Sequence, residues 1–260
     1  MSMVHPDNAA GSPARGRALV ADLLALGVRP GGVLLVHSSL RALGPAAGGP
    51  HAVIAALREA LGPGGTLLLP ALSYAAVTPG HPVFDVHATP SCVGIIPETF
   101  RQLPGVQRSL HPTHSVCGIG PLASELLGAH LSDTTPCGPC SPFHLLPEVH
   151  GQILMLGCGL GPDTSLHAVE ELVVPPYLFG PPLRYTLVRQ DGTRVERDYL
   201  THGFVGWRQR YDRVGQMLAA PDLRTGSVLA AGCHLLEAAA LWEHALAALR
   251  RDALAFVEPA

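Results

Sequence analysis

Short, almost wholly apolar runs alternate with helix-like segments over the first 175 residues, and this alternation constrains the fold more than any other feature. The runs are Gly32–His37, Thr66–Pro70 and Gln152–Leu156. Each lacks the polar alternation of a half-exposed strand, so each predicts a strand buried on both faces. Arg15–Leu26 and Pro50–Leu61 have the apolar spacing of amphipathic helices. This order predicts an α/β fold, a three-layer α/β/α arrangement with a mostly parallel central sheet.

The C-terminal third has a different pattern. Residues 184–190 and 193–199 flank Asp191-Gly192, a dipeptide typical of a tight β-hairpin turn. Trp207–Ala219 and Cys233–Arg250 read as amphipathic helices. We therefore expect one domain over residues 1–260, with a core at about 15–180 and a hairpin-plus-helices portion at about 181–260.

Composition excludes several classes of protein. The chain has 260 residues, a formal net charge of -3 and 14% charged residues, without a basic cluster that would suit nucleic acid. It lacks an apolar run near the roughly 20 residues of a membrane span, and its N-terminus lacks the apolar core of a signal peptide. We expect a cytoplasmic protein with neither a nucleic-acid nor a membrane partner; the oligomeric state is left open.

The chain contains no lysine: all 17 basic residues are arginine. A Walker-type phosphate loop, a pyridoxal Schiff base and a lysine nucleophile are thereby excluded. Phosphate groups, if bound, must be recognised by arginine, helix N-termini and loop amides.

The C-x-x-C motif at Cys137-Gly138-Pro139-Cys140 has three interpretations: a redox dithiol, half of a zinc site, or a structural loop. The preceding Thr135-Pro136 does not end a strand, and a second C-x-x-C is absent from the sequence. The structural loop is favoured, and the sequence does not decide whether the two cysteines bind metal.

The segment Thr164–Glu171 carries the strongest chemical signal. It follows an apolar run and a glycine-rich turn, and on a helix Glu170 lies at i+3 and Glu171 at i+4 from His167. A carboxylate bonded to one ring nitrogen fixes the tautomer and makes the other nitrogen a better base. The pattern predicts a general base; the alternative is an ion pair on a helix surface.

The residues His37–Gly44 leave the first buried strand at its C-terminal end, where α/β sheets bind ligands. The small hydroxyl residues and free amides there suit a pyrophosphate or an oxyanion, although an ordinary polar strand exit would look the same. Ser38 or Ser39 as a nucleophile is a weaker interpretation, because neither lies in a G-x-S-x-G elbow.

The segment Arg108–Ser115 gathers a cation, two imidazoles and several hydroxyls. A phosphate contact by Arg108 is the favoured interpretation. H-x-x-H at His111 and His114 is a weak zinc signal, and the sequence has no H-E-x-x-H. No metal is expected.

Taken together, these motifs resemble the aminoglycoside 3-N-acetyltransferase family, within the antibiotic N-acetyltransferase superfamily. The matching segments, in chain order, are residues 36–44, 65–70, 98–101, 108–115, 135–138, 141–143, 154–157 and 164–170. The resemblance covers residues 15–180 well and the remainder loosely. It implies an α/β/α fold, acetyl-CoA as co-substrate, a primary amine of a small molecule as acceptor, and antibiotic resistance or biosynthesis as the setting.

The resemblance also assigns residues. His167 with Glu170 matches the family's H-x-x-E catalytic pair, and the Thr164 hydroxyl or the loop amides near Ser39 are expected to stabilise the oxyanion. The expected CoA site consists of His37, Ser38, Ser39, Leu40, Arg41, Arg108 and Ser109. The residues expected on the acceptor side are Glu98, Glu171 and His202. The alternatives are an acyl hydrolase or thioesterase that uses Ser38 or Ser39, and a non-catalytic protein that sequesters a ligand.

The chain departs from the family in its C-terminal charge. Residues 176–216 contain more arginines than acids, whereas the members that modify polycationic aminoglycosides line this side with acids. The arginines are Arg184, Arg189, Arg194, Arg197, Arg208, Arg210 and Arg213, and the acids are Asp191, Glu196, Asp198 and Asp212. We therefore expect an acceptor that is neutral, or that carries a carboxylate or phosphate beside its amine.

Overall fold

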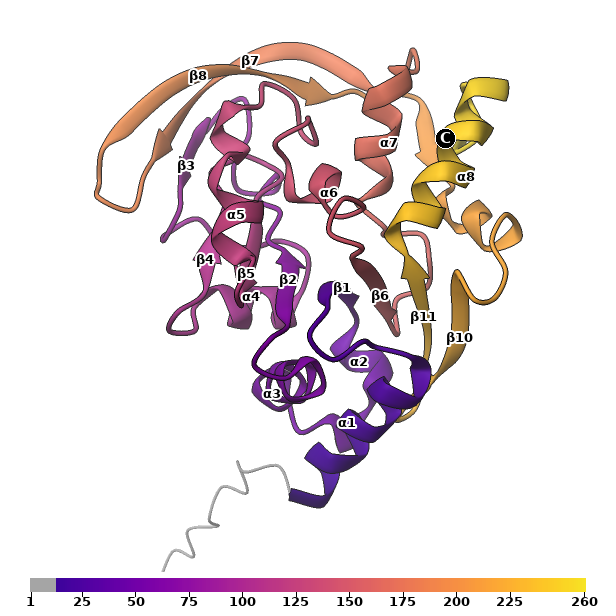
Figure 1. Ribbon diagram of the computed structural model, residues 1–260. Helices are drawn as coiled ribbons and strands as arrows, with labels where there is room; N and C mark the ends of the chain where they lie inside the picture. Colours follow the sequence, from indigo (N-terminus) through magenta and orange to yellow (C-terminus); the bar gives the residue numbers. More distant parts are fainter. Residues whose placement is uncertain (1–12) are drawn as a thin grey trace, which may run out of the picture.

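A seven-stranded sheet lies at the centre of the computed structural model, which describes residues 13–260 (Figure 1). Its strands, in spatial order, are β10 (Leu223–Val228), β11 (Ala231–Glu237), β6 (Gln152–Leu156), β1 (Val33–Ser38), β2 (Thr66–Pro70), β5 (Val116–Ile119) and β4 (Gln107–Arg108). The central strands β6, β1 and β2 are parallel, and antiparallel strands extend the sheet on both sides. The predicted α/β class is confirmed, with parallel pairing in the middle of the sheet.

Helices cover both faces of this sheet because its central strands are apolar on both sides. Leu34 and Val36 of β1 join one core, whereas Val33 and Leu35 join the other. The first core is completed by α1 (Pro13–Leu26), α2 (Leu40–Leu43), α3 (Pro50–Leu61) and α4 (Ile95–Arg101). The second is completed by α5 (Ala123–Gly128), α6 (Pro142–Leu145), α7 (Leu166–Val173) and α8 (Ala238–Arg251). These are the three predicted layers.

A long hairpin arches over the second layer from α7 toward β3 (Figure 1). It consists of β7 (Phe179–Val188) and β8 (Arg194–His202), which are antiparallel, as the sequence predicts. Strand β3 (Val83–Asp85) pairs with β7 and so ties the segment after β2 to the hairpin. Two further short strands, β9 (Trp207–Gln209) and β12 (Val257–Pro259), pair with each other. The 3₁₀ helices are η1 (Pro45–Ala47), η2 (His130–Ser132) and η3 (Tyr211–Gln216).

Two C-terminal predictions are wrong. The helix expected over 207–219 is strand β9 followed by η3. The helix expected from Cys233 begins only at Ala238, because residues 231–237 form β11 and pair with β6. Within residues 13–260, none of the helices is long and apolar enough to cross a membrane.

Candidate active site

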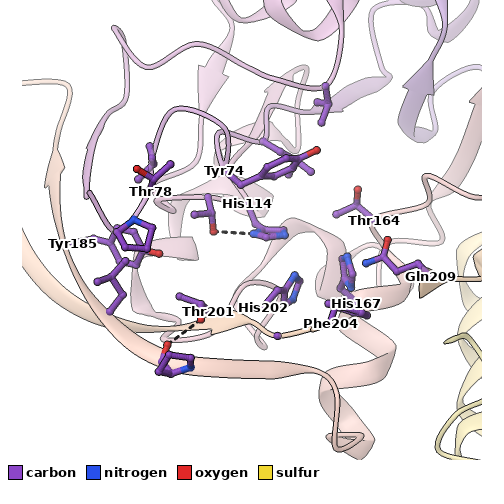
Figure 2. A pocket seen from close by; sticks show the side chains of 18 of the residues that line it. Tyr74, Thr78, His114, Thr164, His167, Tyr185, Thr201, His202, Phe204 and Gln209 are labelled. Atoms are coloured by element: carbon purple, nitrogen blue, oxygen red, sulfur yellow. Dashed lines mark hydrogen bonds between the residues drawn. The ribbon is translucent and has the colours of Figure 1, made fainter. Parts of the chain in front are cut away.

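A cavity of about 830 Å³ lies between the loops at one edge of the sheet and the hairpin that covers them (Figure 2). Its walls come from segments far apart in the chain: Tyr74 from the loop after β2, His114 from the turn before β5, His167 from α7 and His202 from the end of β8. Its volume is in the range of sites for small molecules.

His167 and Glu170 form the pair that the helical spacing predicts. The Nδ1 atom of His167 lies 2.9 Å from Oε2 of Glu170, and Glu170 is 0% exposed. A carboxylate accepts hydrogen bonds, so it fixes the proton of His167 on Nδ1. The Nε2 atom is then the basic nitrogen, on a ring that lines the cavity.

Two tyrosines hold the carboxylate of Glu170 in place. The hydroxyl of Tyr177 donates to Oε1 at 2.8 Å, and the hydroxyl of Tyr211 donates to Oε2 at 2.6 Å. The Tyr211 oxygen is also 2.7 Å from Nδ1 of His167. Such outer partners satisfy a buried charge and fix the orientation of the ring in front of it.

The turn before α7 is held by a buried aspartate. Oδ1 of Asp163 accepts hydrogen bonds from the backbone N–H and the hydroxyl of Ser165, at 3.0 and 2.6 Å. Burial raises the pKa of Asp163 to about 6. At the start of this turn Gly157 has φ 74°, and a Cβ there would lie 2.7 Å from the side chain of Ala42. Glycine is therefore required where the chain leaves β6.

Two more imidazoles face His167. The ring centroids of His202 and His167 are 4.2 Å apart, and those of His114 and His202 are 4.5 Å apart. Burial lowers the pKa of both His114 and His202 well below the usual range, and the neighbouring imidazoles act in the same direction. Both rings are therefore neutral at neutral pH. The predicted site residue His202 does line the cavity.

A smaller cavity of about 130 Å³ adjoins the large one and shares Thr164 with it. His37 and Ser38, at the end of β1, contribute to its wall. Neither Nε2 of His37 nor Oγ of Ser38 has a hydrogen-bond partner among the described residues. Burial lowers the pKa of His37 to about 3, so its ring is neutral. Its Nε2 atom lies 3.6 Å from Oδ1 of the buried Asp163. Beyond this cavity, Ser39 precedes α2, which contains Leu40 and Arg41.

Arg108 and Ser109, both expected in a CoA site, are held by hydrogen bonds within the protein. The guanidinium of Arg108 donates to the carbonyl oxygens of Thr89 and Ala71, at 2.5 and 2.8 Å, and to the hydroxyl of Ser115 at 2.9 Å. Burial lowers the pKa of Arg108 to about 10. The hydroxyl of Ser109 is buried against Nδ1 of His130, at 2.9 Å. The sequence identifies Arg108 as a cation, but it does not show which carbonyl oxygens surround the guanidinium in the fold.

Replacing Arg108 with methionine is expected to lower the free energy of unfolding by about 1–3 kcal/mol, because buried carbonyls lose their donors. The KM for acetyl-CoA is expected to stay close to wild type. Urea denaturation and steady-state kinetics measure the two effects. Arg184→Met, at an exposed ion pair, is the control and should change stability by less than about 0.5 kcal/mol. A raised KM for acetyl-CoA in the Arg108→Met variant, with an unchanged free energy of unfolding, would support a contact between Arg108 and a phosphate group of CoA.

Neither Glu98 nor Glu171, both expected on the acceptor side, lines the large cavity among the described residues. Glu98 pairs with Arg101 at 2.6 Å on α4. Glu171 accepts from the hydroxyl of Thr135 at 2.5 Å and from the backbone N–H of Cys137 at 2.7 Å. Burial raises the pKa of Glu171 to about 7. Its contacts attach the segment before α6 to α7.

The C-x-x-C segment fits the structural loop. Cys137 is fully buried, and burial raises the pKa of its thiol well above the usual range. The backbone N–H of Cys140 donates to the carboxylate of Asp133 at 3.0 Å. A thiol kept protonated in this way is a poor nucleophile.

None of the arginines of the C-terminal portion lines the large cavity among the described residues. Arg208, Arg210 and Arg213 form ion pairs with Glu258. Arg184 pairs with Glu196 and Asp198, and Arg197 donates to the carbonyl oxygens of Leu131 and Ser132. The expectation of an anionic acceptor therefore loses its basis.

Sequence reasoning missed the tyrosines. Tyr211 lies in η3, where the sequence indicated one long helix, and Tyr177 lies in the proline-rich segment that was expected to be a boundary. The cavity also includes Tyr185, Phe204 and Gln209. Tyr185 lies on β7, which pairs with β8; Phe204 follows β8, and Gln209 lies on β9, which pairs with β12. The local pattern of each segment does not reveal these positions.

The chain is similar to proteins of known family. The family model described as aminoglycoside 3-N-acetyltransferase matches residues 35–250. Aminoglycoside N(3)-acetyltransferase IV from Salmonella sp is 39% identical over 246 residues, which cover 94% of this chain and 91% of that protein. A mutant of AAC(3)-IVa in complex with a gentamicin has 36% identity and a TM-score of 0.79, over 94% and 92% of the two chains. The AAC-IIIb binary complex with CoASH has 28% identity and a TM-score of 0.79, over 94% and 98%.

Proposed function

Because this chain belongs to the aminoglycoside 3-N-acetyltransferase family, a family of acyltransferases that use acetyl-CoA, we propose that it transfers the acetyl group directly to a primary amine in the large cavity, with His167 as general base. The observation that carries this proposal is the buried Glu170 at Nδ1 of His167, which leaves Nε2 as the basic atom. Glu170, which is fully buried, positions the ring, and Tyr211 holds this carboxylate in place.

The reaction needs a group that accepts the proton of the amine and a group that stabilises the negative charge on the thioester oxygen. The lone pair of the neutral acceptor amine forms the C–N bond at the thioester carbonyl, and Nε2 of His167 takes the proton that this nitrogen then releases. The C–S bond breaks, and the proton on the imidazolium passes to the sulfur of CoA. Glu170 stabilises the imidazolium while it exists. The hydroxyl of Thr164, on the wall shared by the two cavities, is suited to donate to the oxyanion.

The smaller cavity suits the arm that carries the thioester. It adjoins the large cavity at Thr164, and His37 and Ser38 of its wall carry an imidazole and a hydroxyl, groups that form hydrogen bonds with amides such as those of a pantetheine arm. We assign the residues from Ser39 to Arg41, which follow this cavity in the chain, to the donor side as well.

The acceptor is proposed to be a hydroxyl-rich amine of low positive charge. The described lining contains no carboxylate; its polar groups are hydroxyls, imidazoles and one amide, those of Tyr74, Thr78, Tyr185, Thr201, His202 and Gln209 among them. Hydroxyls and aromatic faces suit a sugar-like molecule. Each ammonium group beyond the reacting one would enter this cavity without a carboxylate to offset its desolvation.

An acetyl-CoA consumption screen tests this assignment. The panel includes gentamicin, apramycin and amino sugars with a single amine. We expect kcat/KM for single-amine acceptors to exceed that for gentamicin by about fivefold or more, since each further ammonium group of gentamicin lacks an ion pair that would contribute about 1 kcal/mol near a surface. Gln209→Glu, which adds a carboxylate of similar shape, should raise kcat/KM for gentamicin about fivefold. Higher kcat/KM for gentamicin in the wild type, unchanged by Gln209→Glu, contradicts the proposal.

A further inference from the structure

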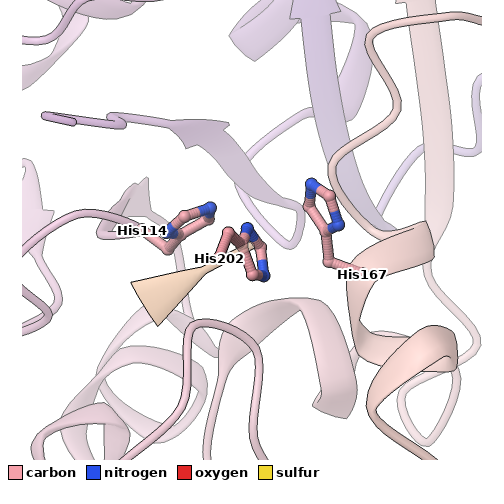
Figure 3. A group of neighbouring side chains, drawn as sticks. All are labelled: His114, His167 and His202. Carbon is pink, nitrogen blue, oxygen red and sulfur yellow. The ribbon is translucent and has the colours of Figure 1, made fainter. Parts of the chain in front are cut away.

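Three histidines from separate segments meet on one wall of the large cavity (Figure 3). His114, His167 and His202 each offer one ring nitrogen, and these three nitrogens all lie within 4.8 Å of one another. We call them the histidine cluster. One such base is enough for the proposed proton transfer, so the convergence of three imidazoles calls for a separate explanation.

The cluster has the features of a ligand set. Nδ1 of His167 is bonded to Glu170, and Nδ1 of His114 is 2.8 Å from the hydroxyl of Thr113, so each ring keeps Nε2 for another partner. Nε2 of His202 is buried and lacks a partner among the described residues. A carboxylate or hydroxyl on the far nitrogen is the usual second partner of a metal-bound imidazole, because it fixes the tautomer and the ring.

We propose that the histidine cluster binds a divalent transition-metal ion of the zinc class, and that this ion reversibly inhibits the enzyme. Imidazole nitrogen is a preferred ligand for such ions, and three imidazoles leave the fourth position of a tetrahedral site open to water from the cavity. A metal bound to Nε2 of His167 occupies the lone pair that accepts the proton. The inhibitory part rests on the proposed function; the binding part does not.

Metal binding is measured without reference to activity. Tag-free protein is titrated with Co²⁺ and followed by visible absorption, and with Zn²⁺ by calorimetry. We expect one ion per chain, with the intense visible bands of four-coordinate cobalt. His202→Ala and His114→Ala should each weaken binding at least about tenfold, as the loss of a ligand does. His51→Ala, at an exposed position on α3, is the matched control and should bind as the wild type does.

Three results would overturn the site: binding unchanged in both cluster variants, weak bands of six-coordinate cobalt only, or thiolate-to-cobalt charge transfer that identifies cysteine ligands. Circular dichroism checks that each variant is folded, and His114→Phe serves as the second variant if His114→Ala is not.

A parallel assay separates the two proposals. We expect Zn²⁺ to inhibit acetyl transfer in the wild type, with recovery on adding EDTA, at the concentration at which it binds. If one Zn²⁺ ion binds at the histidine cluster and acetyl transfer is not inhibited, the role of His167 as base is contradicted. If His167→Ala loses turnover but the wild type binds no metal, only the metal site is contradicted.

Discussion

His167→Ala is expected to lower kcat by about 10²–10⁴-fold, the usual cost of removing a general base. The reason is geometric: Nδ1 is engaged by Glu170, and Nε2 is the remaining basic atom on a ring that lines the cavity. Steady-state kinetics with a saturating amine measures the loss, and the KM for acetyl-CoA should change little.

The stability of this variant is measured beside its rate, because His167 is mostly buried. His144→Ala, at a histidine next to Trp242 and outside the described lining of the large cavity, is the control for loss of an imidazole. Turnover of His167→Ala close to wild type, in a folded protein, contradicts its role as base.

Glu170→Gln is expected to lower kcat by about 10²–10⁴-fold, although the side chain keeps nearly the same shape. An amide has one acceptor oxygen, whereas Glu170 accepts from His167, Tyr177 and Tyr211 with two. The variant therefore loses both the fixed tautomer and the negative charge that stabilises imidazolium; in a serine-protease triad the analogous change costs about 10⁴-fold. Because imidazolium becomes less stable, the acid limb of the pH–rate profile should move to lower pH.

Glu171→Gln is the matched control for Glu170→Gln. It changes the adjacent carboxylate, which contacts Thr135 and Cys137 and not His167. We expect its kcat to stay within about threefold of wild type, because neither the tautomer nor the charge beside His167 changes. Equal losses in the two variants, without a shift of the pH–rate profile in Glu170→Gln, would mean that Glu170 acts only through stability.

The middle of the fold was predictable because its signals are local. An apolar run such as Leu34–Leu35–Val36 cannot expose either face, so it predicts a strand between two helical layers. The C-terminal portion was less predictable. Cys233 to Glu237 is apolar enough for either a helix or a strand, and only pairing with β6 makes it a strand.

The candidate site likewise has a part that the sequence predicts and a part that it does not predict. His167 and Glu170 are one helical turn apart, so their contact follows from the sequence alone. Tyr211 reaches them from η3, and His202 from the end of the hairpin, through contacts that residue spacing does not encode. The charge count over residues 176–216 was misleading for the same reason, since Glu258, near the C-terminus, also pairs with Arg208, Arg210 and Arg213.

Direct transfer is the central claim, and a rapid-quench experiment with acetyl-labelled acetyl-CoA, at enzyme in excess, tests it most directly. Ser38 and Ser39 are the two residues that a hydrolase would acylate, and the hydroxyl of Ser38 has no hydrogen-bonded base among the described residues. We predict that the label passes from acetyl-CoA to the amine at one rate, never appears on the protein, and stays on CoA when amine is omitted. Label on Ser38 or Ser39 before product forms, with CoA released at the same rate without amine, would contradict direct transfer.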